Sequence, residues 1–285
     1  MSAYTIVPYE RKHRQAIFDL IFESHNTHIH LDWHRSDEWL ELEDNTILLA
    51  FADDSLHGVM GFAGPLVQTC WLRLIIIADE AIDSSITLDL WHAAKVALRG
   101  QNIHKIAVLL LEDWARKLYK AMGLTHVENI ITLSRGGQLP PERKERKLAV
   151  TVQLASVDHI AQMVAIDNSA FDPIWQMTTD EIRRAKKLAA VCTIARTPDS
   201  TAIGYQLSTL YNRSGHLARI AVSPNAQNMG VGAALLDDLL WRLMRRETRG
   251  VTVNTQSTNW RSQRLYQHYG FRRNGHSIPV WMAKL

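Results

Sequence analysis

The feature that most limits how this chain can fold is a seven-residue phrase that occurs twice. Leu118–Leu124 reads Leu-Tyr-Lys-Ala-Met-Gly-Leu, and Leu265–Phe271 reads Leu-Tyr-Gln-His-Tyr-Gly-Phe. The copies are 147 positions apart, and the same offset carries the opening stretch Tyr4–Val7 onto Thr151–Leu154. A repeat of this length has the size of a domain and is far longer than the unit of a solenoid protein. The sequence therefore predicts a chain built from two related domains.

The join between the two halves has the composition of an exposed linker. Two glycines and two prolines are followed by a run of mixed charges in the segment Ser134–Leu148. Glycine and proline interrupt helices and strands, and segments of this kind connect domains. A length of 285 residues also suits two domains better than one. We therefore expect a first domain at 1–134, a linker at 135–148 and a second domain at 149–285.

Composition excludes several classes of protein. With 46% hydrophobic and 21% charged residues, the chain is typical of a globular protein. Its longest apolar run, Leu72–Ala78, is interrupted by Arg73 and is too short to cross a bilayer. The polar N-terminus shows no signal peptide, so we expect a cytoplasmic protein without a membrane partner. Two cysteines 122 positions apart exclude a disulfide scaffold and a zinc ribbon. A net charge of +3 does not indicate a nucleic-acid partner.

Hydrophobic spacing predicts an α/β class, with a mixed sheet, in each half of the chain. In the second half the expected order is strand, two helices, three strands, helix, strand, helix and a terminal strand. The expected strands cover residues 149–154, 189–196, 201–211, 216–222, 250–256 and 278–282, and the expected helices cover residues 157–171, 178–188, 231–247 and 259–269. The first half follows a similar order.

The stretch His216–Leu236 runs from an apolar strand through a glycine-containing turn directly into a helix. Gly230 and Gly232 have no Cβ, so the backbone N–H groups beside them can approach a phosphate closely. The positive end of the helix dipole would face the same anion. Two glycines at this spacing are also typical of a plain tight turn. The stretch lacks the Gly-Lys-Ser/Thr ending of a nucleotide P-loop, and it lacks the third glycine and the acidic residue of a dinucleotide fold.

A second pattern further along the chain distinguishes between these interpretations of the glycine turn. Residues 222–236 follow Val-x-Pro-x-x-Gln-x-x-Gly-Val-Gly-x-x-Leu-Leu, and residues 259–271 follow Asn-x-x-Ser-x-x-Leu-Tyr-x-x-x-Gly-Phe. Together they resemble the acetyl-CoA-binding core of the Gcn5-related N-acetyltransferase (GNAT) superfamily. The first half is similar in a degenerate form, so the whole chain resembles a tandem GNAT protein. The resemblance implies two domains, each with a twisted, mostly antiparallel sheet flanked by helices, whose fourth and fifth strands splay apart to hold coenzyme A.

The resemblance also implies which residues would bind acetyl-CoA as co-substrate. The main chain of the fourth strand would pair with the pantetheine arm like an added strand, and the glycine turn would hold the pyrophosphate. Asn259 matches the family's cofactor-contacting asparagine, and Ser262 stands where an alanine is more usual. The implied cofactor-binding residues are Ile220, Ala221, Val222, Gln227, Asn228, Met229, Gly230, Val231, Gly232, Ala233, Asn259 and Tyr266.

Two residues are candidates for proton transfer, Tyr266 and His216. Tyr266 matches the family's tyrosine near the cofactor sulfur, and a phenol is suited to protonating a departing thiolate. The alternative is an ordinary half-buried aromatic residue. Many family members use a glutamate near the start of the fourth strand as general base, but no acidic residue lies between Asp199 and Asp237. His216 stands near that place and an imidazole titrates close to neutral pH, whereas the alternative is a solvent-exposed histidine at a strand edge.

The first half departs from the pattern where the glycine turn would be. The stretch Ile77–Ile86 contains no glycine, and its acidic residues Asp79, Glu80 and Asp83 would repel a pyrophosphate. The repeat offset also places Glu112 where the second half has its asparagine. We therefore expect the first domain not to bind coenzyme A productively, and to complete the acceptor pocket or to stand in for the second subunit of a dimer. For the same reason a monomer is favoured over a dimer.

A histidine-rich stretch, His25–His34, is the remaining feature of the first half. His30 and His34 would share one face of a helix, a spacing that can hold a metal ion. The stretch lacks the glutamate of the zinc-protease pattern, and a polar surface is the alternative. We expect no metal site.

The leading hypothesis is an acetyl-CoA-dependent N-acetyltransferase in which the primary amine of a small molecule or a peptide attacks directly in a ternary complex. The motif region contains no cysteine, which argues against an acyl-enzyme. Three alternatives stay open: a non-catalytic acyl-CoA-binding sensor, an enzyme similar to mycothiol synthase that acetylates a small-molecule amine, and an aminoacyl-tRNA-dependent transferase. The last would not need the glycine turn, and the modest charge offers no tRNA-sized basic patch.

Overall fold

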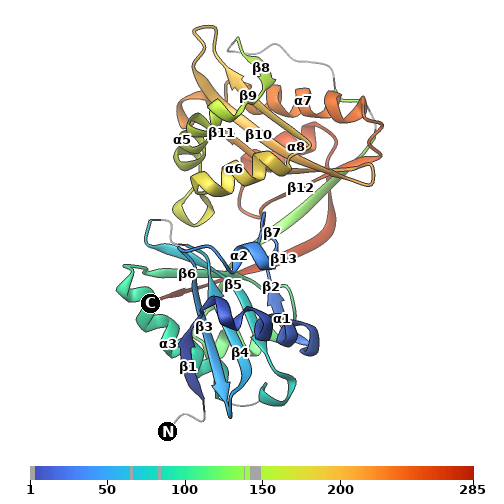
Figure 1. Ribbon diagram of the computed structural model, residues 1–285. Helices are drawn as coiled ribbons and strands as arrows, with labels where there is room; N and C mark the ends of the chain where they lie inside the picture. Colours follow the sequence, from blue (N-terminus) through green and yellow to red (C-terminus); the bar gives the residue numbers. More distant parts are fainter. Residues whose placement is uncertain (1–3, 65–66, 83–84, 138, 142–148) are drawn as a thin grey trace. The chain divides into compact units, whose positions relative to one another are not determined.

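The computed structural model describes residues 4–64, 67–82, 85–137, 139–141 and 149–285. The chain divides into two compact units (Figure 1). The first unit consists of Met1–Glu128 together with Ile278–Leu285, and the second consists of Asn129–Ser277. Each unit combines a twisted sheet with flanking helices, as the sequence predicts for an α/β fold.

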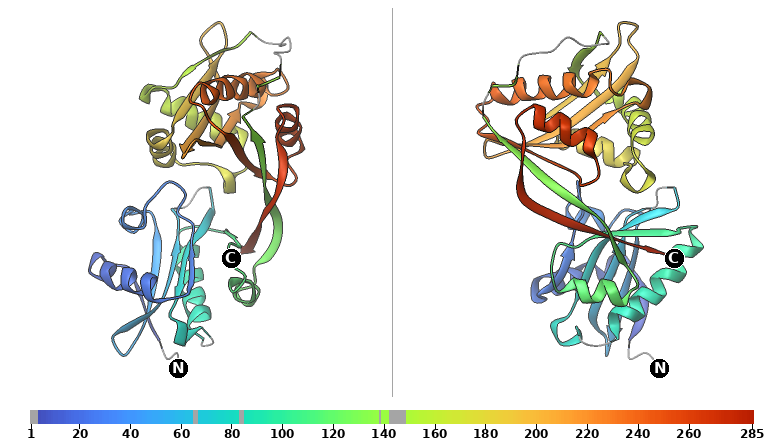
Figure 2. Two further views of the ribbon diagram at one scale, coloured as in Figure 1. Left: turned by 90° about the vertical axis from the view of Figure 1, so that its right-hand side faces the viewer. Right: turned by 180° about the vertical axis from the view of Figure 1, so that it is seen from behind.

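The sheet of the first unit has the strand order β1-β3-β4-β5-β6-β13, in which β13 (Arg272–Lys284) takes part through its last residues, and β2 pairs with β5 outside this path. Helices α1 and α2 lie on one face of this sheet and α3 on the other (Figure 2). The elements of this unit are β1 Thr5–Pro8, α1 Arg14–Glu23, β2 Asn26–Ile29, α2 Ser36–Trp39, β3 Thr46–Ala52, β4 Ser55–Phe62, β5 Thr69–Ile77, α3 Ile86–Gly100, β6 Lys105–Leu109 and α4 Ala115–Ala121, with short 3-10 turns at Arg11–His13 and Asp79–Ala81.

The sheet of the second unit has the order β7-β12-β11-β10-β9-β8. Its neighbours pair antiparallel except β11 and β12, which are parallel. The elements are β7 Thr125–Gly136, β8 Thr151–Leu154, α5 Ile160–Ala170, α6 Thr179–Leu188, β9 Val191–Arg196, β10 Ala202–Tyr211, β11 Ser214–Val222, α7 Val231–Met244, β12 Gly250–Gln256, α8 Trp260–His268 and β13 Arg272–Lys284, with 3-10 turns at Val157–His159, Pro173–Trp175 and Pro224–Ala226.

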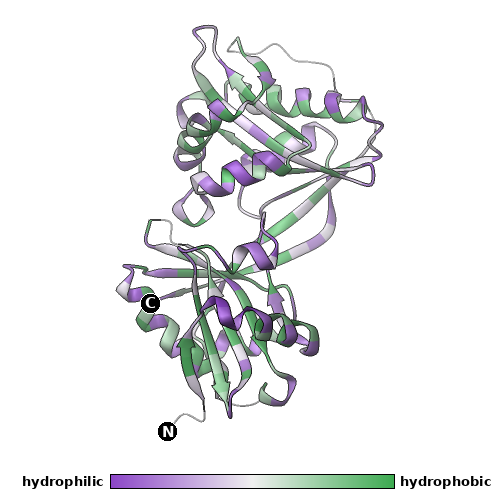
Figure 3. Cartoon of the chain, viewed as in Figure 1, coloured by the Kyte–Doolittle hydropathy of each residue, from purple (hydrophilic) through white to green (hydrophobic). Residues whose placement is uncertain are grey.

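The predicted order of elements in the second half is confirmed, and local chemistry explains where the helices begin. Thr178 caps α6 by accepting a hydrogen bond from the Glu181 N–H, and the Glu181 carboxylate accepts one from the Thr178 N–H in return. Asn259 caps α8 by accepting from the Ser262 N–H at 3.1 Å. Figure 3 shows α6 as mostly hydrophilic, and its inward face buries Ile182 and Ala185.

The predicted splay of the fourth and fifth strands is present in the second unit. Strands β11 and β12 pair only along Ser214–Leu217 and Gly250–Val253, and beyond these residues no pairing continues between them. A β-bulge in the pairing of β10 with β11, between Leu207 and Ser208, coincides with the point of separation. The resulting V is the place where a ligand can reach the main chain of β11.

The sheet of each unit is completed by a strand from outside the linear repeat. The C-terminal residues Val280–Lys284 pair with β6 of the first unit, and the chain end marked C in Figure 2 lies in that sheet. Residues Ile130–Gly136 of β7 pair with β12 of the second unit. The compact units therefore divide the chain differently from the predicted domains 1–134 and 149–285, which describe the duplicated sequence. Of the predicted linker, Arg135 and Gly136 already belong to β7, whereas 138 and 142–148 lie outside the described residues.

Each unit has its own hydrophobic core. In the first unit the buried faces of β3, β4 and β5 pack against α1 and α3. In the second unit, leucines of α7 such as Leu236 and Leu239 pack on Leu217 of β11 and Val253 of β12. No helix in the described part of the chain is both long and apolar enough to span a bilayer.

Candidate cofactor site

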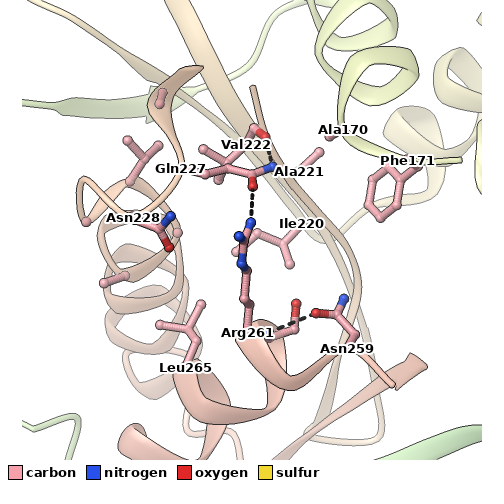
Figure 4. A pocket seen from close by; sticks show the side chains of 16 residues that line it. Ala170, Phe171, Ile220, Ala221, Val222, Gln227, Asn228, Asn259, Arg261 and Leu265 are labelled. Atoms are coloured by element: carbon pink, nitrogen blue, oxygen red, sulfur yellow. Dashed lines mark hydrogen bonds between the residues drawn. The ribbon is translucent and has the colours of Figure 1, made fainter. Parts of the chain in front are cut away.

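A cavity of about 470 Å³ opens in the second unit where β11 leaves β12 (Figure 4). The end of β11, the turn that follows it, the first turns of α7 and α8 and the end of α5 form its walls. The lining residues are Ala170, Phe171, Ile220, Ala221, Val222, Ala226, Gln227, Asn228, Gly230, Val231, Gly232, Ala233, Asn259, Arg261, Ser262 and Leu265. All the cofactor residues implied by the sequence resemblance are in this set except Met229 and Tyr266.

The glycine turn has the geometry of an anion cradle. Gly230 is the N-cap of α7 and has a φ of +89°, a left-handed conformation that residues with a Cβ rarely adopt. A Cβ on Gly232 would lie 3.3 Å from Cδ2 of Leu265, so a side chain at this position would be crowded against another residue of the cavity lining. Helix α7 has 14 residues and no acidic residue in its first turn, so its free N–H groups and the positive end of its dipole are available to an anion.

The end of β11 offers main-chain groups to the cavity. The Ser223 N–H donates to the Ile203 carbonyl at 2.9 Å, so on this strand Ser223 belongs to a hydrogen-bonded pair with β10. Because such pairs alternate along an antiparallel ladder, the main-chain groups of Ile220 and Val222 point away from β10 and into the V. These are the donors and acceptors that an amide-containing ligand could pair with in the manner of an added strand.

Among the described residues that line the cavity, Arg261 is the one charged side chain, and the sequence patterns did not identify it. Its Nη1 donates to Oε1 of Gln227 at 3.0 Å, and Nε2 of Gln227 donates to the Val222 carbonyl at 3.1 Å. Figure 4 shows this chain of hydrogen bonds crossing the cavity from α8 to β11. The sequence signal that could have identified Arg261 is its position two residues after Asn259, in the first turn of the helix that Asn259 caps.

Tyr266 and Met229 lie beside the cavity rather than on its lining. Tyr266 is buried, and its ring packs against Phe271 with centroids 5.8 Å apart. Burial raises the pKa of the Tyr266 phenol above its ordinary value, and a hydrogen bond with the lining residue Ser262 opposes that rise. The phenol is thus one side chain removed from the cavity and protonated at neutral pH. Met229 is 38% exposed between two lining residues of the turn.

His216 lies on the closed part of the V and is absent from the lining. It stands opposite Thr252 in the short parallel pairing of β11 with β12, and its Nδ1 is 2.8 Å from the Thr252 hydroxyl oxygen. Burial lowers the pKa of His216, so the imidazole is neutral at pH 7. The predicted proton-transfer pair, Tyr266 and His216, is therefore not brought together at the cavity, and both catalytic roles stay predictions.

In the first unit the equivalent groove is filled by the chain itself. Gly58 pairs with Ile77 at the end of β5 as Gly204 pairs with Val222 at the end of β11. Strand β5 also leaves β6 after a short parallel pairing. Here, however, β2 pairs antiparallel with β5, with Asn26 opposite Ile77. Strand β2 thus occupies the edge that β11 leaves open in the second unit.

Asp79 holds the beginning of β2 in place. Its Oδ1 accepts from the His25 N–H and from Nδ2 of Asn26, both at 2.9 Å, and its Oδ2 is 2.6 Å from Nδ1 of His25. The Ser24 hydroxyl donates to the carbonyl of Ile77. The sequence suggested that Asp79 would repel a phosphate. In the structure, Asp79 instead anchors the segment that fills the groove. Asp83, the third acidic residue of this stretch, lies outside the described residues.

The histidine-rich stretch of the first unit is a strand followed by a turn, so the spacing of His30 and His34 does not place them on one helix face. His30 contacts Asp32 and Arg73, with its Nδ1 2.7 Å from Nη1 of Arg73. His28 is buried against Tyr119, and burial lowers its pKa to about 3. Within the described residues no group of histidine, cysteine and acidic side chains has the arrangement of a metal site.

Comparisons with known proteins agree with this geometry. The model of the acetyltransferase (GNAT) family matches residues 160–271, which include the whole cavity lining. No curated protein matches the chain in sequence. A GCN5-related N-acetyltransferase from Sphaerobacter thermophilus is similar in structure, with 16% identity, coverage of 100% of this chain and 96% of the other, and a TM-score of 0.60.

Two further solved structures are similar over almost the full length. A tandem GNAT protein from the clavulanic acid biosynthesis pathway has 13% identity, covers 99% of this chain and 98% of its own, and gives a TM-score of 0.64. A probable N-acyltransferase from Enterococcus faecalis has 9% identity, covers 99% of this chain and 72% of its own, and gives a TM-score of 0.71. At these identities the likeness establishes the fold. Residues 160–271 of the second unit accordingly match the acetyltransferase (GNAT) family, and the chain as a whole has the fold of the tandem GNAT structures.

Proposed function

We propose that the chain is an acetyl-CoA-dependent N-acetyltransferase whose second unit transfers an acetyl group to a primary amine. The observation that carries this proposal is the combination, in one cavity, of an open strand edge at Ile220 and Val222 with a glycine cradle at the start of α7. The GNAT family supports an acyl-CoA-dependent acetyltransferase in general, and the amine acceptor and the direct attack are parts of the proposal.

The residues present fit acetyl-CoA. The ligand has a pyrophosphate for the N–H groups of the turn from Gln227 to Ala233, and amides for the main chain of Ile220 and Val222. When bound, acetyl-CoA supplies an activated acetyl thioester. Arg261 would leave Gln227 and place its positive charge beside a phosphate, a role for which a guanidinium is suited. Gln227 would then release the Val222 carbonyl as a further acceptor.

Proton transfer is assigned to Tyr266 and His216 in this proposal. Tyr266 keeps its phenol proton because its pKa is raised, so through Ser262 it can supply a hydrogen bond toward the cavity but cannot act as a base. His216 is neutral at pH 7 and can accept a proton, which would have to reach it through water because it does not line the cavity. The acceptor is a primary amine of a small molecule or a peptide.

One observation favours a second candidate, a non-catalytic acyl-CoA sensor. No carboxylate or imidazole is present among the described residues that line the cavity. A sensor needs only the binding half of the site. An enzyme needs a proton acceptor within reach of the attacking amine, directly or through water.

Calorimetric titration of acetyl-CoA into the full chain tests the proposal, followed by turnover with a panel of primary amines. We expect one site per chain, because β2 fills the equivalent groove of the first unit. Binding with turnover of any amine supports the enzyme, and binding without turnover across the panel supports the sensor. Folded protein that does not bind acetyl-CoA would contradict both.

A further inference from the structure

Phe171 forms the wall of the cavity opposite the start of α7, together with its neighbour Ala170 (Figure 4). It follows the last residue of α5, and its N–H still donates to the main-chain carbonyl of Asp167 at 3.1 Å. The ring is covered by the guanidinium of Arg219, whose Cζ lies 3.7 Å from the ring centroid. A cation at this distance over an aromatic ring is attracted to it, and it also occupies the space into which the ring could retreat.

Arg219 is itself held by a buried carboxylate. Its Nε and Nη2 donate to the two carboxylate oxygens of Asp167, each at 2.8 Å, and the Tyr205 hydroxyl donates to the same carboxylate at 2.5 Å. Asp167 and Tyr205 are completely buried. Burial works against a charge on Arg219, but Tyr205 and Asp167 keep the pKa of the guanidinium above its ordinary value. A two-pronged ion pair of this kind has one preferred geometry, so it fixes the guanidinium of Arg219 and, with it, the position of the Phe171 ring.

The same pair fixes the segment that follows Phe171. Nη2 of Arg219 donates to the Trp175 carbonyl at 2.6 Å, and the Met177 N–H donates to the Asp167 carboxylate at 2.9 Å. The Gln176 side chain donates to the Phe171 carbonyl at 2.9 Å. The backbone on both sides of the ring is therefore tied to buried groups, and the ring is a fixed wall rather than a movable one.

The proposed orientation of acetyl-CoA places its acyl end at Phe171. This step rests on the proposed function. The phosphates would lie at the start of α7, which follows Val222 by a short turn. A pantetheine arm that pairs with Val222 and then Ile220 runs away from that cradle, toward the point where β11 and β12 join. The acyl group would come after the arm, next to Ile220 and Phe171, both of which line the cavity.

We propose that Phe171, fixed by the Asp167–Arg219 pair, is the specificity-determining residue that limits the acyl group to a short chain. Phe171 would contact the acyl group, whereas Arg219 and Asp167 are positioning residues that act through it. A buried methylene strengthens binding about fourfold where space exists for it. Where the fixed Phe171 ring leaves no space for additional methylenes, a longer acyl chain does not gain this affinity, and removal of the ring restores the gain.

The test is calorimetric titration of acetyl-CoA and butyryl-CoA into the full chain, which needs no knowledge of the acceptor. We expect the wild-type chain to bind butyryl-CoA no more tightly than acetyl-CoA. We expect Phe171→Ala to shift the ratio of the two Kd values by roughly tenfold in favour of butyryl-CoA, and Phe171→Leu to give an intermediate ratio. Leu265→Ala is the matched control, because it enlarges the cavity on the side of Gly232 and is expected to leave the ratio unchanged.

Arg219→Lys tests the positioning role while it keeps a positive charge beside Asp167. A lysine cannot reproduce the two-pronged contact or cover the ring, so we expect a partial shift of the same ratio. If this variant does not fold, the Phe171 series still decides the matter. An unchanged ratio in folded Phe171→Ala would overturn the proposal while leaving the acetyltransferase intact. A wild-type chain that binds neither acyl-CoA would overturn the proposed function as well.

Discussion

Gly230 has the backbone conformation in the cofactor cavity that other residues adopt least easily. Its φ of +89° turns the chain from the 3-10 turn after β11 into α7, and Gly230 and its neighbours Asn228 and Val231 line the cavity. A side chain here has a conformational cost of about 1 kcal/mol and also stands in the path of an anion.

We therefore predict that Gly230→Ala weakens acetyl-CoA binding by about tenfold or more, because one charge-assisted hydrogen bond contributes roughly 1.5–3 kcal/mol. Calorimetry measures the change. Gly123→Ala is the matched control: Gly123 has a φ of +82°, lies in the first unit, and has open space where a Cβ would be. The two variants should lose similar stability in thermal unfolding, and only Gly230→Ala should lose affinity. Equal affinities would argue against an anion cradle at this turn.

His216 provides a second prediction at the scale of single residues, based on pH. Burial lowers its pKa below the ordinary 6.5, so the neutral form that can accept a proton persists below pH 6.5 and is lost as the pH falls through the lowered value. If His216 is the general base, kcat falls over that acidic range. His216→Ala should then lower kcat by about 100-fold at pH 7 and remove the acidic limb. A variant with wild-type kcat at every pH would exclude His216 from the mechanism.

At the scale of elements, the two units differ in one strand. In the first unit β2 fills the edge of β5, and in the second unit the segment between α5 and α6 leaves the edge of β11 open. The acidic residues and the missing glycine of the first half predict that the first unit binds coenzyme A poorly. The pairing of β2 with β5 was not predictable from these features, because the sequence of a four-residue strand does not indicate which other strand it will pair with. Hydrogen bonding of a free strand edge is satisfied by whichever segment tertiary contacts bring to it.

The anchoring of β2 by His25 and Asp79 makes its stability depend on pH. Their hydrogen bond raises the pKa of His25 above 6.5 and lowers the pKa of Asp79 below 3.8. The contribution of the lowered Asp79 is present above pH 3.8 and is lost as the pH falls through its folded value. The contribution of the raised His25 is present below pH 6.5 and is lost as the pH rises through its folded value. The anchor is therefore complete between these two limits.

We predict that hydrogen-exchange protection factors of the β2 amides are highest near pH 5 and decrease toward pH 9. Asp79→Asn removes the charge of the anchor, and it should lower the protection of Asn26–Ile29 at pH 5 and flatten its dependence on pH. Glu80→Gln is the control, because Glu80 is a neighbouring acidic residue that contacts His57 instead of His25. Protection that is equal in wild type and Asp79→Asn throughout this range would show that β2 does not depend on the anchor.

At the scale of the whole molecule, the C-terminus of the chain stabilises the first unit. Val280 and Trp281 are buried in the first unit although they follow the second unit in sequence, and the Trp281 ring contacts Tyr119 with centroids 6.3 Å apart. Residues 280–284 also provide the hydrogen-bonded neighbour of β6. The first unit is therefore not complete until the last residues of the chain are in place.

We predict that Trp281→Ala destabilises the first unit by about 3–5 kcal/mol, the usual cost of removing a large buried aromatic side chain. Hydrogen exchange should report lost protection in β6 and α4, while β9 and β10 of the second unit stay protected. Trp260→Ala is the matched control, because Trp260 is 63% exposed and should change stability by less than about 0.5 kcal/mol. Loss of protection confined to the second unit would contradict the assignment of Trp281 to the first core.

The sequence by itself predicted the duplication and the order of helices and strands in the second half, and its resemblance to the GNAT superfamily implied the splay of β11 from β12 and most of the cavity lining. The order of the elements depends on local signals: apolar spacing, helix caps such as Thr178, and glycines where the backbone needs them. Tertiary structure decided which strand completes each sheet, what fills the groove of the first unit, and that Arg261 and Phe171 reach the cavity. Those contacts join residues far apart in the chain, and their partners are set by packing and hydrogen-bond satisfaction across the whole fold, which no local pattern encodes.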